Sequence, residues 1–265
     1  MSGTSSEQLL KIGLSLPFRE YTQLQEVRDI PECFEFLELT GELISHIVQL
    51  RSENELLQEF EAINFRDLLP PSLTAQLPAA GKSIVYEYKK TLRELFAQAY
   101  NCHAQTVSLD PDWEALANNP DARKIFNDVL CSTAGDREYY NLILSLSVRI
   151  PHTGSRKIAE FVHLLHQLSS HRVQAVLDIN PHEMLNSPID WQQELQMFRF
   201  CTSHVRFCYP SELGNKLLYK HIEPVITALK KYQRKITVYI APSGRADLGE
   251  LAAMVNEITG ESELL

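Results

Sequence analysis

The stretch "NLILSLSVRIPHTGSRKIAEFVHLLHQLSSHRVQAVLDINPHE", residues 141–183, decides the fold because two strand patterns flank one helix pattern. Residues 141–152 alternate apolar and polar side chains, which is typical of a strand. Residues 155–170 follow a helical pattern, and the apolar run Val173–Asp178 is a second strand that ends in a carboxylate. Residues 180–182 are expected to form a turn. A strand–helix–strand unit predicts two parallel strands joined by a crossover helix.

The same alternation of short apolar runs and helical patterns extends along the rest of the chain. The further predicted strands are residues 11–18, 34–41, 62–71, 104–112, 202–210 and 235–244. Eight such units in about 250 residues predict an α/β fold, a single (β/α)₈ TIM barrel, with one domain over residues 1–265. An open doubly wound sheet is the alternative, but no GxGxxG or GxxxxGK[ST] motif follows an early strand.

Two residues predict where helices begin. Asp112 precedes Trp113 and can accept a hydrogen bond from the first turn, so we expect it to cap a helix that starts there. Pro224 interrupts the helical pattern of residues 217–232. Because proline is tolerated at the first helical position, we expect the helix proper to begin at Pro224.

Composition limits the partners and the cellular compartment. The net charge of -9 disfavours general binding to nucleic acid or to an anionic membrane. No segment approaches the roughly 20 apolar residues that span a bilayer, and the N-terminus does not resemble a signal peptide. The five cysteines are scattered and form no CxxC pair, which favours a reducing cytoplasm over a disulfide framework.

Side-chain alternation predicts which residues line the barrel, because successive strand residues point to opposite sides. In "LILSLSVR" the leucines face the helices, so Ser147 and Arg149 face inward. In "TSHVRFCY" the inward positions are His204 and Arg206. Functional residues of such barrels lie at the C-terminal ends of the strands. The predicted mouth therefore contains Glu38, Arg66, Ser147, Arg149, Asp178, Arg206 and Tyr239.

These patterns resemble the xylose isomerase-like TIM barrels, which include sugar and sugar-phosphate isomerases and epimerases and the endonuclease IV relatives. "FEFLEL" (34–39) is similar to the second-strand pattern of that family, and "AYNCHAQTVSL" (99–109) to the segment leading into strand four. The most specific piece, "LHQLSSHRVQAVLDINPHE" (165–183), resembles the sixth-strand segment. "SHVRFCYPSE" (203–212) and "KKYQRKITVYIAPS" (230–243) fall at strands seven and eight.

The resemblance implies a divalent metal held by Glu, Asp, His and Glu from strands five to eight. Carried over residue by residue, these positions are Ser147, Asp178, Arg206 and Tyr239, so only Asp178 keeps its type. One carboxylate does not hold a divalent ion firmly, since such sites need three or more ligands. We therefore expect a metal-independent, divergent member, in which the Arg206 guanidinium replaces the metal charge and forms a bidentate pair with Asp178.

The resemblance also implies an activity, namely isomerisation or epimerisation of a sugar or sugar derivative. In that interpretation Glu38 or Asp178 is the base, and Arg206 polarises the carbonyl group. The arginines would also suit a small anionic sugar-like ligand, unless each one only neutralises a nearby carboxylate. The candidate catalytic residues are Glu38, Asp178 and Arg206, and the candidate substrate-binding residues are Arg66, Arg149, His182, His204 and Tyr239.

Two other hypotheses remain open at this point. The first keeps a divalent metal on a shifted ligand set formed by Asp178, His182 and His204, with Asp110 or Glu38 as a further ligand. The second is a non-catalytic barrel that acts as a scaffold or regulatory protein, with a protein partner or a second copy of the chain bound through its surface helices.

Overall fold

Eight parallel strands close into a barrel in the computed structural model, which gives the structure of residues 10–17, 29–49, 60–68, 82–150, 155–168, 172–209, 219–232, 235–242, 248–249, 251–253 and 255–256. The strands are β1 (Leu10–Ser15), β2 (Phe36–Thr40), β3 (Ala62–Arg66), β4 (Ala104–Leu109), β5 (Ile143–Ile150), β6 (Val173–Ile179), β7 (Thr202–Tyr209) and β8 (Ile236–Pro242). Each strand pairs with the next in the chain, and β8 pairs with β1, so the ring has no open edge. The (β/α)₈ barrel predicted from the sequence is confirmed.

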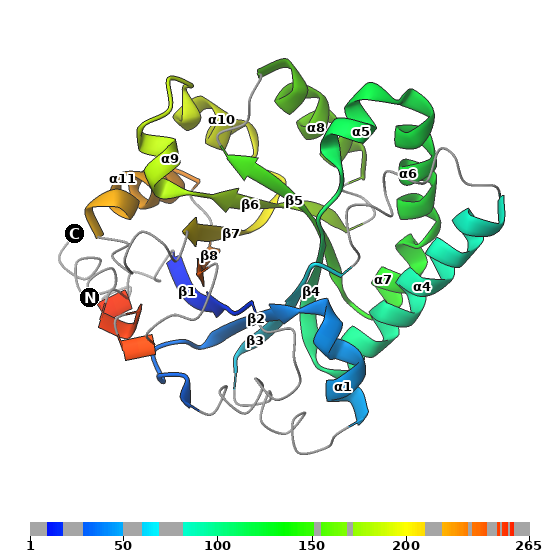
Figure 1. Ribbon diagram of the computed structural model, residues 1–265, viewed down its shortest axis with the longest axis horizontal. Helices are drawn as coiled ribbons and strands as arrows, with labels where there is room; N and C mark the ends of the chain where they lie inside the picture. The colour runs from blue at the N-terminus through cyan, green and yellow to red at the C-terminus, as the bar shows by residue number, and fades with distance from the viewer. Residues whose placement is uncertain are drawn as a thin grey trace, which may run out of the picture.

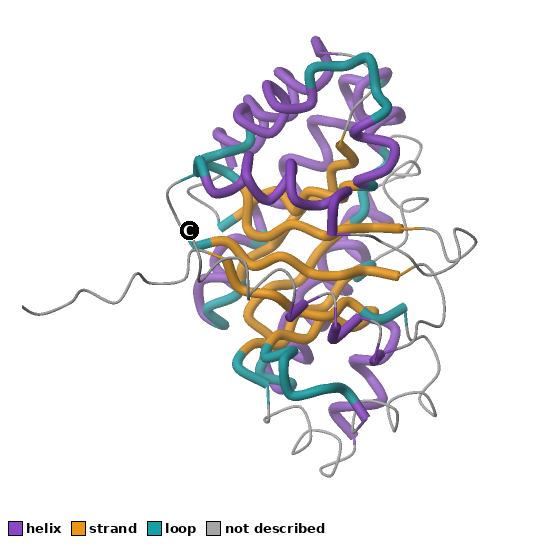
Figure 2. Tube along the Cα trace, turned by 90° about the vertical axis from the view of Figure 1, so that its left-hand side faces the viewer, coloured by secondary structure: helices purple, strands orange, loops and turns teal. Residues whose placement is uncertain are grey.

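Helices surround the strands on the outside of the ring (Figures 1 and 2). They are the short η2 (Gly41–Leu43), α1 (Ile44–Gln49), α4 (Lys82–Asn101), α5 (Trp113–Asn118), α6 (Pro120–Ser132), α7 (Ala134–Tyr139), α8 (Ser155–Leu168), α9 (Pro181–Leu185), α10 (Trp191–Met197) and α11 (Tyr219–Lys230). Within the part of the chain that the structure describes, no helix is long and apolar enough to cross a membrane.

The layer between strands and helices forms the main hydrophobic core. The leucines at 142, 144 and 146 are fully buried in it, as the alternation of the sequence predicts. On the other side of β5, Ser145 and Ser147 point into the barrel interior, where both make hydrogen bonds to residues of other strands. The strand alternation therefore separates an apolar outer layer from a polar interior.

The barrel interior narrows where β1, β2 and β8 meet. A Cβ atom built on Gly13 of β1 would lie 2.6 Å from Cε1 of Tyr239 and 2.7 Å from Cβ of Phe36. Both contacts are shorter than real Cβ contacts, so the absence of a side chain at residue 13 is what admits the Tyr239 ring to the interior.

Helix starts agree with the sequence in one case and differ in two. Asp112 caps α5 as predicted, since its carboxylate accepts a hydrogen bond from the Ala115 amide at 2.8 Å. The expected turn at residues 180–182 is instead the start of α9, because the Asn180 side chain accepts from two backbone amides and Pro181 occupies the first helical position.

The prediction that a helix begins at Pro224 is wrong. Helix α11 begins at Tyr219, and Pro224 lies inside it. A proline inside a helix removes one backbone hydrogen bond and crowds the carbonyl group four residues before it. Burial of Ile222 in the core is a tertiary contact that favours the helical turn before the proline.

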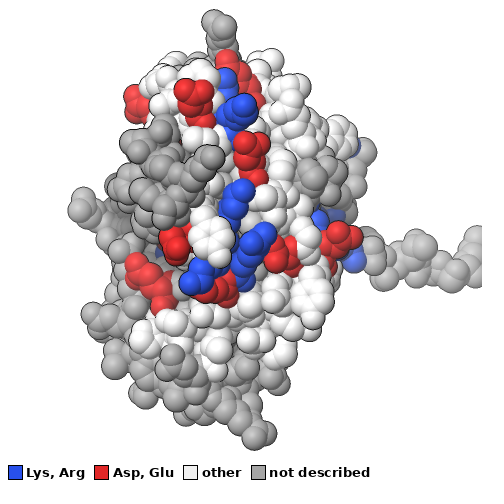
Figure 3. Space-filling model, turned by 90° about the vertical axis from the view of Figure 1, so that its right-hand side faces the viewer, with Lys and Arg blue, Asp and Glu red and all other residues white. Residues whose placement is uncertain are grey.

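The face formed by α4, α6 and neighbouring helices carries basic and acidic side chains that alternate (Figure 3). Several of them pair, namely Lys90 with Glu94 at 3.9 Å, Arg93 with Asp136 at 3.0 Å and Arg123 with Glu160 at 3.4 Å. Exposed pairs of this kind contribute little to stability. They leave this face with mixed charge rather than one extended patch of a single sign.

Candidate active site at the barrel mouth

Arg206 is the centre of a buried polar network inside the barrel. Its side chain is 3% exposed and points inward from β7. Its donors are Nε to Glu38 Oε2 at 2.7 Å, Nη2 to Glu38 Oε1 at 2.9 Å and to Ser108 Oγ at 2.6 Å, and Nη1 to Asp178 Oδ1 at 3.0 Å and to Ser147 Oγ at 3.2 Å. A guanidinium has five N–H groups, and these contacts use all of them.

Glu38 of β2 is the bidentate partner of Arg206. Besides the two arginine contacts, its carboxylate accepts a hydrogen bond from Ser15 Oγ at 2.6 Å and lies 3.1 Å from His204 Nε2. The carboxylate therefore has a donor for each of about four lone-pair positions. Burial by itself raises the pKa of Glu38, but the Arg206 charge and the His204 hydrogen bond outweigh it and hold that pKa well below its ordinary value.

The prediction that Arg206 and Asp178 form a bidentate pair is wrong, because the bidentate partner of Arg206 is Glu38. Asp178 receives one bond from Arg206, and its other oxygen accepts a hydrogen bond from Ser147 Oγ. The Arg206 fork is directed across the barrel to Glu38 instead of towards the neighbouring strand β6. The Asp178 side chain stays 25% exposed, whereas Glu38 is fully buried.

His204 and Tyr239, both predicted to bind substrate, are almost fully buried in the barrel interior. His204 is 2% exposed, and burial lowers its pKa despite the nearby Glu38, so the imidazole is neutral with Nε2–H donated to Glu38. Tyr239 accepts a hydrogen bond from Asn64 Nδ2 at 2.8 Å and packs with Phe36. Burial and the Glu38 charge raise the pKa of Tyr239 well above its ordinary value, so it is no base near neutral pH.

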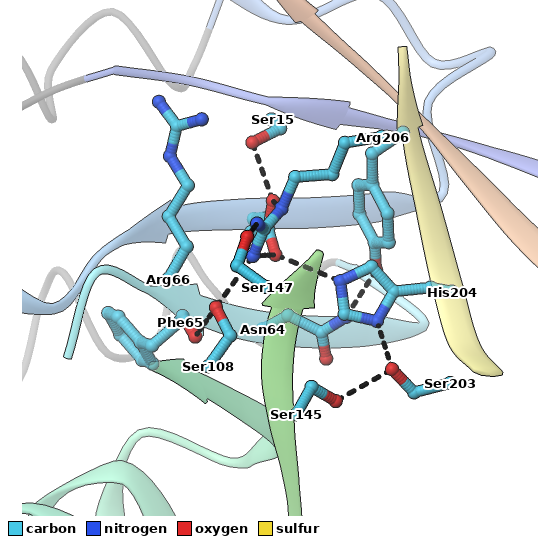
Figure 4. Close-up of polar contacts among 12 residues, drawn as sticks. Ser15, Asn64, Phe65, Arg66, Ser108, Ser145, Ser147, Ser203, His204 and Arg206 are labelled. Atoms are coloured by element: carbon cyan, nitrogen blue, oxygen red, sulfur yellow. Dashed lines mark hydrogen bonds and ion pairs between the residues drawn. The ribbon is translucent and has the colours of Figure 1, made fainter. Parts of the chain in front are cut away.

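The remaining predicted binding residues are spread over different places. Arg149 is directed outward, where it is 68% exposed and contacts Glu183 at 2.6 Å. His182 is an exposed residue of α9. Arg66, the last residue of β3, extends away from the Arg206 network, and no contact joins it to the side chains around Arg206 (Figure 4). The three arginines predicted to line the mouth therefore do not converge on one point.

Asp110 is the mouth residue that the sequence did not single out as an acid or base. It follows β4 directly, and part of its side chain is exposed to solvent. Partial burial and the negative charges of Asp178 and Asp67 raise its pKa to about 6. The sequence suggests it only as a further metal ligand. Ser147 is among the predicted mouth residues, but Ser108 and Ser15, which contact Arg206 and Glu38, are not, although Ser108 occupies an inward position of an alternating strand.

The residues present do not fit a divalent metal. In the described ranges of the chain, no three His, Cys, Asp or Glu side chains are grouped as possible ligands. His182 and His204 of the shifted ligand set are respectively exposed on a helix and buried against Glu38. The guanidinium of Arg206, already a cation, lies between Glu38 and Asp178, the two carboxylates that such an ion would need.

Comparison with known structures shows which fold this chain shares. No protein-family model and no curated protein sequence matches the chain. The chain is similar to the crystal structures of 3-keto-D-glucoside 4-epimerase from E. coli (14% identity, TM-score 0.66, covering 92% of this chain and 98% of that one) and of D-psicose 3-epimerase with D-tagatose from Clostridium cellulolyticum H10 (13%, 0.68, 96% and 98%). The fold is a xylose isomerase-like TIM barrel.

The same barrel is found in structures with a different described activity. An AP endonuclease of family 2 from Brucella melitensis matches at 15% identity and a TM-score of 0.61, covering 92% of this chain and 96% of that one. Because these identities are low, the likeness of this xylose isomerase-like barrel to both kinds of protein shows its fold alone. Its chemistry has to be argued from its own side chains.

The pairing of Glu38 predicts how stability changes on acidification. The pKa of Glu38 in the folded protein is below its ordinary value of about 4.3. Its contribution to the free energy of unfolding is therefore complete above about pH 4.3 and is lost as the pH falls through the pKa of the folded protein. We expect the melting temperature of the parent to fall more steeply below about pH 4 than that of Glu38→Gln. Thermal melts across this range check it, and parallel curves for the two proteins would contradict it.

Proposed function

We propose that this barrel is a metal-independent isomerase or epimerase of a sugar or sugar derivative, with Asp178 and Asp110 as the proton-transferring groups. One observation carries the proposal. Asp178 is partly exposed and ion-paired with Arg206, and its negative charge, together with burial, raises the pKa of Asp110 to about 6. Neighbouring carboxylates in different environments are a recurrent arrangement for acid–base work near neutral pH. The sugar epimerases that share the fold support the reaction class.

The proposed chemistry is proton transfer at a carbon beside a carbonyl group. One carboxylate removes the proton from that carbon, and the electron pair moves onto the carbonyl oxygen to give an enediolate. Return of a proton to the other face of the same carbon gives the epimer. Return to the former carbonyl carbon gives the isomer, provided that the proton of the adjacent hydroxyl group moves to the former carbonyl oxygen. Asp110 follows β4 directly and Asp178 is the penultimate residue of β6, so the two carboxylates come from the C-terminal ends of different strands.

Glu38 and Arg206 have positioning roles in this proposal rather than the catalytic roles expected from the sequence. Arg206 has no N–H left to polarise a carbonyl, and Glu38 has no lone pair left to take a proton. Arg206 instead fixes the orientation of Asp178 and keeps a positive charge beside it. This arrangement supports the hypothesis that a guanidinium takes the electrostatic place of the family metal.

An exchange experiment tests the proposal. The protein is incubated in D₂O with a panel of ketoses, aldoses, sugar phosphates and sugar acids, and deuterium beside the carbonyl is detected by NMR. For an active compound we expect Asp178→Asn to slow the exchange by about 100-fold or more, because general acid–base groups contribute at least that much. The rate of the parent should rise with pH through about 6 as Asp110 ionises, and Asp110→Asn should remove that rise.

Asp128→Asn is the matched control, because Asp128 is an exposed aspartate on α6, away from the strand ends. It should exchange deuterium at the rate of the parent. The proposal fails if the parent exchanges no deuterium into any compound of the panel, or if Asp178→Asn and Asp128→Asn behave alike.

A second candidate function is a non-catalytic barrel that acts as a scaffold or regulatory protein. The observation in its favour is that Arg206 and Glu38 satisfy each other completely without any ligand. In that case a stable complex with a protein partner or a second copy of the chain is expected on affinity capture. The five free cysteines support a cytoplasmic location for either function.

A further inference from the structure

Arg66 differs from the other two arginines predicted at the mouth because its ion pair with Asp67 is too long to be a hydrogen bond. Arg206 uses all its donors inside the barrel, and Arg149 contacts Glu183 at the surface. The Arg66 side chain is only 15% exposed, and its Nε atom is shielded from solvent with no hydrogen-bond partner among the described residues. A buried donor without an acceptor is costly, which makes such a group in a folded protein a candidate ligand contact.

The backbone after β3 explains why Arg66 lacks a partner. Asp67 adopts a left-handed conformation with φ of 52°, and the next amide, that of Leu68, donates to Ser108 O at 2.9 Å. This turn leaves Asp67 Oδ2 at 3.8 Å from Arg66 Nε, which is beyond hydrogen-bond distance. The nearest carboxylate therefore balances the charge of Arg66 in part but does not satisfy its donor.

Arg66 also lies within electrostatic range of the opposite strand of the mouth. Burial and the Asp178 carboxylate raise the pKa of the Cys208 thiol on β7, and the charges of Arg206 and Arg66 oppose that rise. Arg66 is also the last residue of β3 and is in register with Thr40 at the end of β2, so an anion bound to it would lie at the same end of the barrel as the two proposed proton-transferring carboxylates.

Among the described residues, the charges at the mouth favour an anion with a single negative charge. Asp67, Asp110 and Asp178 are acidic, and Arg206 already balances Glu38, so Arg66 is the cation that the described part of the mouth offers to a ligand. A phosphate near neutral pH carries up to two negative charges and would be repelled by the three carboxylates. A carboxylate carries one charge, and its two oxygens match the planar fork of an arginine.

We infer that the ligand of this barrel is a sugar acid whose carboxylate binds the guanidinium of Arg66. This inference rests on the proposed function and narrows its substrate class, because it selects sugar acids over neutral sugars and sugar phosphates. Arg66 is a specificity-determining residue in it, distinct from Asp178 and Asp110.

A matched series of three probes tests the inference. D-Galactose, D-galacturonate and D-galactose 6-phosphate differ only in the group at carbon six, and binding of each is measured by thermal shift and calorimetry. We expect D-galacturonate to bind at least tenfold more tightly than the other two. Arg66→Gln should weaken that binding at least tenfold, and Arg66→Lys should weaken it less, because lysine keeps the charge but loses the fork.

Arg149→Gln is the control, because it removes an exposed arginine that already has a carboxylate partner, and its binding of D-galacturonate should equal that of the parent. Circular dichroism of Arg66→Gln verifies that the variant is folded, and Arg66→Lys serves as the test if it is not. Tighter binding of the phosphate or the neutral sugar, no binding of any probe, or unchanged binding in the Arg66 variants would each overturn the inference.

The exchange experiment separates this inference from the proposed function. Deuterium exchange into neutral sugars that Arg66→Gln leaves unchanged would overturn the role of Arg66 while supporting the proposed reaction. Arg66-dependent binding of D-galacturonate without exchange into any compound would support the sugar-acid site while rejecting the catalytic proposal.

Discussion

Arg206→Ala is expected to lower the free energy of unfolding by about 3–5 kcal/mol, because it leaves a buried carboxylate without its partner. Glu38 is fully buried and receives two of its four hydrogen bonds from Arg206. Asp178 loses its ion pair in the same variant. For a chain of this size the change corresponds to a fall of roughly 10 °C in melting temperature, which calorimetry or thermal circular dichroism measures directly.

Two further variants show whether the loss of stability comes from the buried Glu38 charge that is left without a partner. Arg149→Ala removes an arginine that is 68% exposed, and its melting temperature should stay close to that of the parent. Arg206→Met combined with Glu38→Gln removes both charges at once, and it should be more stable than Arg206→Ala. A melting temperature of Arg206→Ala within about 2 °C of the parent would contradict the central role of this pair.

Gly13→Ala is expected to lower the free energy of unfolding by about 1–3 kcal/mol, the usual cost of an added methyl group in a packed interior. The new Cβ would lie 2.6 Å from the Tyr239 ring and 2.8 Å from the carbonyl oxygen of Phe36, so both neighbours have to move. Because Tyr239 also contacts His204 edge-on, the displacement should extend into the polar network.

Gly135→Ala is the matched control for this substitution. Gly135 lies in α7, and a Cβ built there has no atom within 4 Å. Alanine is a better helix former than glycine, so this variant should match the parent or exceed its stability by up to about 1 kcal/mol. Chemical denaturation of both variants checks the pair of expectations, and equal effects of the two substitutions would contradict the close approach at Gly13.

The barrel could be predicted from the sequence because local patterns determine most of it. The leucines and serines of β5 alternate without interruption, so one strand shows both the outer and the inner layer. Helix boundaries were less predictable, because they depend on tertiary burial. The case of Pro224 shows this, since burial of Ile222 favours the helical turn before it.

The candidate site could be predicted only in part, because alternation gives the direction of a side chain but not its partner. Arg206 and Glu38 were both expected to point inward, yet their bidentate contact spans the barrel and depends on how β2 and β7 are placed across it. The raised pKa of Asp110 was also beyond reach, because it depends on tertiary burial and on Asp178 and Asp67, which belong to other parts of the barrel.

The complete mutual pairing inside this barrel has an evolutionary consequence. If histidine replaced Arg206 alone, Glu38 and Asp178 would keep their charges with no permanent cation between them, and the chain would lose stability before any metal ligand set was complete. Building a metal centre at this place would require several substitutions together, since Ser147 and Tyr239 are neither carboxylates nor imidazoles. Single substitutions within the network therefore destabilise the fold, whereas substitutions at the rim of the barrel do not disturb this pairing.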